Sequence, residues 1–142
     1  MGVVINFEGT VTNLNTVKSS TAAILDCRDS LRAVITRASS LMECPTSFPY
    51  EAEILVKELG YSIKACERFR HKCISPEVRR QLEVIKLRAW VLRHATEPMR
   101  VALLEADLQK RAIALREFGR HVGLFSREVC SLFMSREFAV AS

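Results

Sequence analysis

Apolar residues recur at alternating steps of three and four along nearly the whole chain, which is the spacing at which one face of an α-helix repeats. The pattern is clear from Val17 to Leu41 and again from Val101 to Leu132. Alternation of apolar and polar residues, which is typical of a strand, occurs nowhere beyond the first few positions. The sequence therefore predicts an all-α fold.

Helix-breaking residues divide this pattern into four segments. The breaks fall at residues 44–49, at Ser75-Pro76 and between Thr96 and Pro98. Proline suits the first turn of a helix, and Ser75 and Thr96 are suitable N-cap residues just ahead of the two prolines. Because the connections are short, we expect an antiparallel bundle of four to five helices.

The same breaks set the expected domain organisation. Residues 1–11 are expected to form an extended N-terminal arm, residues 12–137 a single helical domain, and residues 138–142 a flexible tail. The last segment begins at Pro98 and runs for about forty residues, which is about 60 Å at the helical rise. A long C-terminal helix of this kind either overhangs the bundle, bends, or pairs with another chain.

The long C-terminal helix is predicted to carry an oligomer or partner interface. The residues of its apolar seam that we assign to this interface are Val101, Leu104, Leu108, Leu115, Phe118, Val122, Phe125, Val129 and Leu132. Arg111 interrupts the seam, so either a charge lies within it or Ala112 takes the inward position. At Gly119 and Gly123 a kink or helix break is favoured over a close approach of two helices.

The third segment is apolar on two sides. Its second face carries Val84, Leu87 and Val91, with Trp90 nearby. A helix of this kind is either central in a bundle or part of an oligomer interface. The surplus apolar surface favours a homo-oligomer, of which a dimer is the simplest form.

The net charge of the chain and its distribution narrow the classes of molecule that the protein is expected to bind. The chain has 142 residues, 49% of them hydrophobic, and a net charge of +5. The charge is uneven, because residues 1–60 carry a net charge of −2 and residues 61–142 one of +7. A positive field concentrated in one region favours an anionic partner, and nucleic acid is the commonest such partner.

Basic residues form stripes on the second and third segments, mostly away from the apolar seams. In a helical hairpin these stripes would join into one elongated positive face, which suits the phosphate backbone of structured or double-stranded RNA. The candidate RNA-binding residues are Lys64, Arg68, Arg70, Lys72, Arg79, Arg80, Lys86 and Arg93. The alternative is an ordinary solvated face, because Glu67 and Glu83 lie at pairing distance from basic neighbours.

The chain has no recognisable catalytic or metal-binding motif. Its cysteines are widely spaced without a C-x-x-C pair, and the chain start does not resemble a secretory signal, so reduced thiols in the cytoplasm or nucleus are expected. Cys44, Cys66, His71 and Cys73 fit no standard zinc spacing. No G-x-S-x-G, P-loop or H-E-x-x-H motif occurs. We therefore expect no enzyme, no cofactor, no metal and no membrane span.

Two functions fit these observations. The first is a non-catalytic helical protein that binds structured or double-stranded RNA through the basic hairpin. The alternative is a protein–protein interaction adaptor, or assembly subunit, whose long C-terminal helix contacts the partner. Both need a small helical protein without site chemistry.

Overall fold

The fold is all-helical. The computed structural model describes the backbone of residues 8–105 and 107–141, and the side chains of residues 21–105 and 107–138. The elements are α1 (Glu8–Glu43), the 3₁₀ turn η1 (Pro45–Ser47), α2 (Phe48–Lys72), α3 (Pro76–Leu104), α4 (Leu108–Phe133) and α5 (Arg136–Ala141). The prediction of an all-α fold is confirmed, because no strand occurs within the described ranges.

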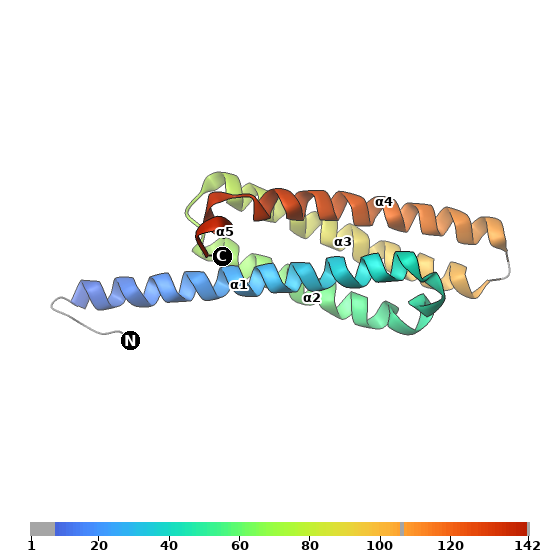
Figure 1. The fold of residues 1–142 in the computed structure, drawn as a ribbon, viewed down its shortest axis with the longest axis horizontal. Helices are drawn as coiled ribbons and strands as arrows, with labels where there is room; N and C mark the ends of the chain where they lie inside the picture. The colour runs from blue at the N-terminus through green and yellow to red at the C-terminus, as the bar shows by residue number, and fades with distance from the viewer. Residues whose placement is uncertain (1–7, 106, 142) are drawn as a thin grey trace.

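The four long helices lie side by side, and each runs back along the one before it (Figure 1). Helix α1 packs against α2 and α4, and α3 packs against α2 and α4. The N-terminal part of α1 extends beyond the other helices, and the short α5 folds back near α1. The connections between the long helices, of three or four residues, are too short to let consecutive long helices point the same way.

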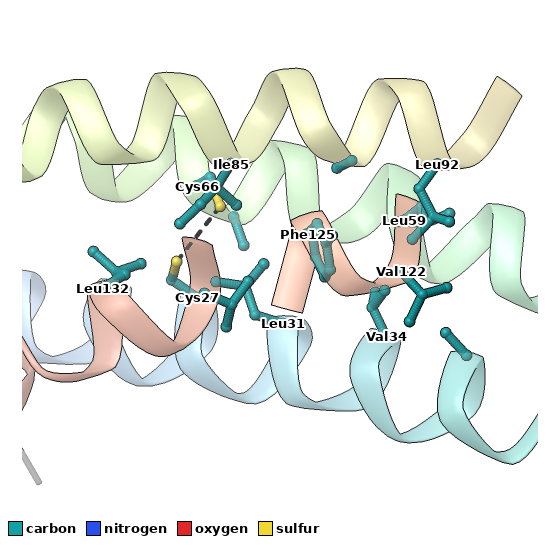
Figure 2. Packing of buried hydrophobic residues seen from close by; sticks show 14 of the residues in the cluster. Cys27, Leu31, Val34, Leu59, Cys66, Ile85, Leu92, Val122, Phe125 and Leu132 are labelled. Atoms are coloured by element: carbon teal, nitrogen blue, oxygen red, sulfur yellow. Dashed lines mark hydrogen bonds between the residues drawn. The ribbon is translucent and has the colours of Figure 1, made fainter. Parts of the chain in front are cut away.

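The core consists of the apolar seams that the helical period predicts. Figure 2 shows labelled side chains from α1, α2, α3 and α4 pointing toward one another between the helices. Phe48 of α2 meets the ring of Phe118 edge to face, with 4.9 Å between the ring centroids. Phe69 of α2 meets Phe138 of α5 in the same way at 5.5 Å. These aromatic contacts join α2 to α4 and to α5.

Helix α3 continues through Pro98, so the predicted break at this residue is wrong. Proline inside a helix removes one backbone hydrogen bond and costs stability. The apolar period nevertheless continues past it, because Thr96, Met99 and Ala102 are buried on the same face as Leu92. The hydroxyl of Thr96 donates to the carbonyl of Leu92 at 2.9 Å instead of capping a new helix. Burial of this last turn outweighs the lost hydrogen bond.

The actual break follows Leu104, and therefore the long C-terminal helix is not formed. Helix α4 has 26 residues and α1, with 36, is longer. Asp107 is the N-cap of α4, and its carboxylate accepts hydrogen bonds from the backbone N–H groups of Gln109 and Lys110 at 2.9 and 3.2 Å. Aspartate is a favoured N-cap residue, so Asp107 was a signal in the sequence for the start of α4, but the break was assigned to Pro98 instead.

Helix α4 is continuous through both of its glycines, so the favoured kink or break is also wrong. A Cβ atom on Gly119 would lie 2.7 Å from Cε of Met42 in α1, whereas one on Gly123 would meet nothing within 4 Å. Gly119 thus allows Met42 to come close to the α4 backbone. Arg111 lies partly buried in the first turns of α4 and Ala112 is exposed, so Ala112 does not take the inward position.

Both chain ends differ from the expectation. Helix α1 begins at Glu8, so residues 8–11 are helical and not extended, while residues 1–7 lie outside the described ranges. The expected flexible tail begins at Phe138, but α5 runs to Ala141 and the ring of Phe138 is buried against Phe69 and Phe133. Burial of this ring orders the C-terminal turn.

We expect Pro98→Ala to stabilise the protein. Alanine restores the missing backbone donor inside α3, so the free energy of unfolding should rise by about 1 to 3 kcal/mol. Pro76→Ala is the matched control, because Pro76 occupies the first turn of the same helix, where its missing N–H costs nothing. Denaturant unfolding followed by circular dichroism measures both. An equal or lower stability for Pro98→Ala would show that α3 needs the proline for its packing.

Candidate interaction surfaces

Two surfaces of the described chain carry the features from which a function can be argued. The first is the basic hairpin, which we define as the C-terminal half of α2, the turn at residues 73–75 and the first five turns of α3. The second is the outward face of α3. Both surfaces include α3, which α2 and α4 hold from its two sides.

The centre of the basic hairpin is an ion-pair network between α2 and α3. Glu67 of α2 pairs with Arg70 at 2.6 Å and with Lys86 of α3. Glu83 of α3 pairs with Arg70 at 2.8 Å and with Lys86 at 3.4 Å. Two carboxylates therefore hold two of the predicted RNA-binding cations and connect the helices at the same time.

Arg68 is held by the neighbouring helix α1. Its guanidinium donates to Oδ2 of Asp26 at 2.8 Å, and the hydroxyl of Tyr61 donates to Oδ1 of the same carboxylate at 2.9 Å. The hydrogen bond from Arg68 lowers the pKa of Asp26, and Asp26 in turn raises the pKa of Arg68. The third predicted cation is thus part of a contact between α1 and α2.

The remaining cations of the prediction are differently placed. Lys64, Arg79 and Arg80 are exposed, and within the described part of the chain none of them has a carboxylate at ion-pair distance. Arg93 lies over the ring of Trp90, with 5.5 Å between Cζ and the ring centroid. Lys72 is also exposed. Arg79 and Arg80 therefore keep positive charge near the turn and Lys64 keeps it toward the other end of the hairpin, while the middle is largely neutralised.

The outward face of α3 repeats the pattern of the buried face, displaced by two residues. The buried series is Val78, Leu82, Ile85, Ala89, Leu92, Thr96 and Met99. The series two residues later, which we call the outer seam, is Arg80, Val84, Leu87, Val91, His94, Pro98 and Val101. A step of two residues along a helix turns the side-chain direction by about 200° around the helix axis. The outer seam therefore faces away from the core along the whole helix.

Apolar side chains of the outer seam are solvent-exposed. The exposed fraction is 37% for Val84, 61% for Leu87 and 44% for Val101, and Trp90 beside the seam is 45% exposed. The Trp90 ring stacks on His94 with 5.4 Å between centroids, which fixes its orientation. Single exposed apolar residues are ordinary, but a row of them along one helix indicates a contact surface.

The seam of α4 lies mostly inside the chain, which corrects the expected interface. Phe118, Val122, Phe125, Val129 and Leu132 are buried in the chain's own core. Leu115 is partly buried against that core. Only the first three of the predicted interface residues are exposed, and they are Val101, Leu104 and Leu108. Because Val101 and Leu104 belong to α3, the exposed apolar surface lies on α3 and its turn into α4.

The thiols and histidines form no cluster that resembles a catalytic or metal site. Sγ of Cys66 lies 3.7 Å from Sγ of Cys27, both buried (Figure 2), and the thiol of Cys73 donates to the Glu137 carboxylate at 3.2 Å. Burial and Glu137 raise the pKa of Cys73 to about 11. The described residues contain no group of His, Cys, Asp and Glu able to hold a metal ion. Nor do they include a helix sufficiently long and apolar to cross a membrane.

No protein-family model matches the chain, and no curated protein or solved structure is detectably similar to it. The proposals below therefore rest on the described contacts alone.

Some residues of these two surfaces were not predicted from the sequence. Asp26 and Tyr61 form long-range contacts that carry no local signal. The outer seam had a signal, because its three-and-four spacing continues beyond Val91 to His94, Pro98 and Val101. The assumed break at Pro98 hid that continuation.

We expect Glu67→Gln to destabilise the protein in a pH-dependent manner. Hydrogen bonds from Arg70 and Lys86 lower the pKa of Glu67 from 4.5 to about 2. The stabilisation by the carboxylate is complete above pH 4.5 and is lost as the pH falls toward 2. Near pH 7 the free energy of unfolding of the variant should be about 1 kcal/mol lower than that of the wild type, because solvent screens this half-exposed network. Near pH 2 the two proteins should be equally stable.

Urea unfolding of both proteins across this pH range measures the difference. Glu53→Gln is the matched control, because Glu53 is highly exposed and makes only a 3.8 Å pair with Lys57. A difference that stays constant with pH would contradict the network.

Proposed function

We propose that this chain is a non-catalytic protein-interaction module that binds an amphipathic helix along the outer seam of α3. The observation that carries the proposal is the exposed row of Val84, Leu87 and Val101, with Trp90 at its side, on a helix whose opposite face is already in the core. A partner helix would bury this row without any change in the fold.

The chemistry of the outer seam fits such a contact. A row spaced by three and four residues matches the spacing of a second helix packed lengthwise. Trp90 is the kind of large aromatic residue that contributes strongly at interfaces, and its stacking on His94 means that little side-chain freedom is lost on binding.

Site-specific photo-crosslinking tests the proposal. A photoreactive amino acid at Leu87 should link the protein to its partner in the cells from which it comes, because Leu87 lies at the centre of the exposed row. The same amino acid at Tyr50, which is 84% exposed on α2, is the control and should give no comparable product. Equal labelling from both positions, or none from Leu87, would contradict the proposal.

A second candidate function is the binding of structured or double-stranded RNA along the basic hairpin. The observation that favours it is the exposure of Lys64 and Arg79 without a carboxylate at ion-pair distance in the described part of the chain. Arg68, Arg70 and Lys86 are already paired, so fewer phosphates could be neutralised than the count of charges indicates.

The RNA candidate predicts that Lys64→Glu combined with Arg79→Glu weakens binding of a double-stranded RNA. The salt dependence of the affinity should also become shallower, because each lost phosphate contact releases about one counterion fewer. Arg116→Glu is the control, because Arg116 lies in the first half of α4, which begins at the opposite end of α3 from the α2–α3 turn. Unchanged affinity and salt dependence in the double variant, measured by fluorescence anisotropy, would rule the candidate out.

A further inference from the structure

The outer seam has the residue pattern of a two-stranded parallel helix pair, and we infer that its partner is the outer seam of a second copy of this chain. The inference rests on the proposed function and names its partner. Taken as a heptad, the seam has Val84 and Val91 at one inward position and Leu87 at the other. β-branched residues at the first position with leucine at the second favour parallel dimers.

The charged residues beside the outer seam also favour a parallel pair. Glu83 lies on one flank and Arg88 on the other, five residues later. In a parallel pair, a residue on the first flank faces the residue five positions later on the other helix. Glu83 of each copy therefore faces Arg88 of the second copy, and twofold symmetry forms this pair twice.

The antiparallel register that places Leu87 opposite Val91 would bring like charges together. Residues of the same flank face each other in an antiparallel pair, so Arg88 would face Arg88 of the second copy, and Glu83 would face Glu97 of the second copy. Two repulsive contacts would replace the attractive ones, so the flanking charges disfavour antiparallel pairing in this register.

The described contacts leave Arg88 available for such a pair. Its Nε atom is buried without a hydrogen-bond partner, and no carboxylate within the described ranges lies at ion-pair distance from its guanidinium. Glu83 pairs with Arg70 and Lys86, but its side chain is still 52% exposed and can accept a further donor. Because Nε is buried inside the single chain, Glu83 of the second copy would contact the rest of the guanidinium of Arg88, which is a partly exposed residue.

Trp90 has a suitable place in the same arrangement. It lies on the flank of Glu83, seven residues later, and in a parallel pair it faces Ala95 of the second copy. The small side chain of Ala95 leaves room for the indole ring. Arg93, whose Cζ lies 5.5 Å from the centroid of this ring, remains at the edge of the contact.

The pair should be reversible, because its apolar part is short. In a parallel pair Arg80 faces Arg80 and His94 faces His94, so close packing is limited to the region from Val84 to Val91. That region spans about two helical turns, far less than a permanent dimer interface needs. The dimer should therefore form and dissociate as the protein concentration changes.

Sedimentation equilibrium of the purified chain, over about a hundredfold range of concentration, tests the inference. The wild type should change from monomer to dimer. Leu87→Asp should stay monomeric with unchanged helicity and melting temperature, because Leu87 is 61% exposed in the single chain. A wild type that is monomeric throughout, or a Leu87→Asp variant that dimerises as well as the wild type, would overturn the inference.

Charge reversal tests the flanking pairs. Arg88→Glu should weaken self-association about tenfold, because it faces Glu83 of the second copy twice. Glu83→Arg should do the same, and an equimolar mixture of the two variants should recover dimers, since each mixed pair then has opposite charges on both flanks. A mixture that associates no better than the single variants would contradict the pairing.

The direction of the helices is tested by a photoreactive amino acid at Arg80, at one end of the seam. In a parallel pair it should link to residues near Arg80 of the second copy, whereas links near Pro98 and Val101 would show an antiparallel pair and overturn the inference. The crosslink at Leu87 separates the two proposals. Capture of a different protein there, by a chain that is monomeric alone, supports the interaction module and rejects the second copy as its partner.

Discussion

Mutual burial of apolar seams is the interaction on which this structure depends. A helix stabilises a bundle only by covering one face, and the three-and-four spacing gives each long helix one such face. Leu31 of α1, Leu59 of α2, Leu92 of α3 and Phe125 of α4 are all fully buried at the centre. The ion pairs that surround this core align the helices but lie at half-exposed positions, where each contributes little.

The same constraint explains why α3 is the functional candidate. The core uses one face of each helix, and α3 has a second row with the same spacing in which Val84, Leu87 and Val91 follow one another without a charge. The corresponding row of α2, Tyr50, Ile54 and Tyr61, is interrupted by Lys57. Exposed apolar surface that does not stabilise the fold lowers solubility. A row of exposed Val, Leu and Trp is therefore expected to contact a binding partner. In α4 the apolar seam is buried inside the chain, and for that reason we place the proposed interface on α3.

Much of the fold could be predicted from the sequence, because the helical period is local information. The turn at Ser75-Pro76 was correctly placed, since Ser75 accepts from the N–H of Val78 and Pro76 opens α3. Pro98 misled the prediction, because a proline that opens a helix and one inside a helix look alike until burial of Met99 and Ala102 is known. The pairing of Arg68 with Asp26, 42 residues apart, depends on the packing of α1 on α2 and has no local signal.

The number of basic residues therefore predicted the free positive charge of the basic hairpin poorly, whereas the apolar period predicted the core well. The hairpin has an excess of cations, but Glu67 and Glu83 sit between Arg70 and Lys86, and Asp26 reaches Arg68 from another helix. Each such pair serves the contact between helices and weakens the field available to a polyanion. The apolar row on α3 has no such internal use. Between the two surfaces, the one that the fold leaves unsatisfied is the stronger candidate for a partner.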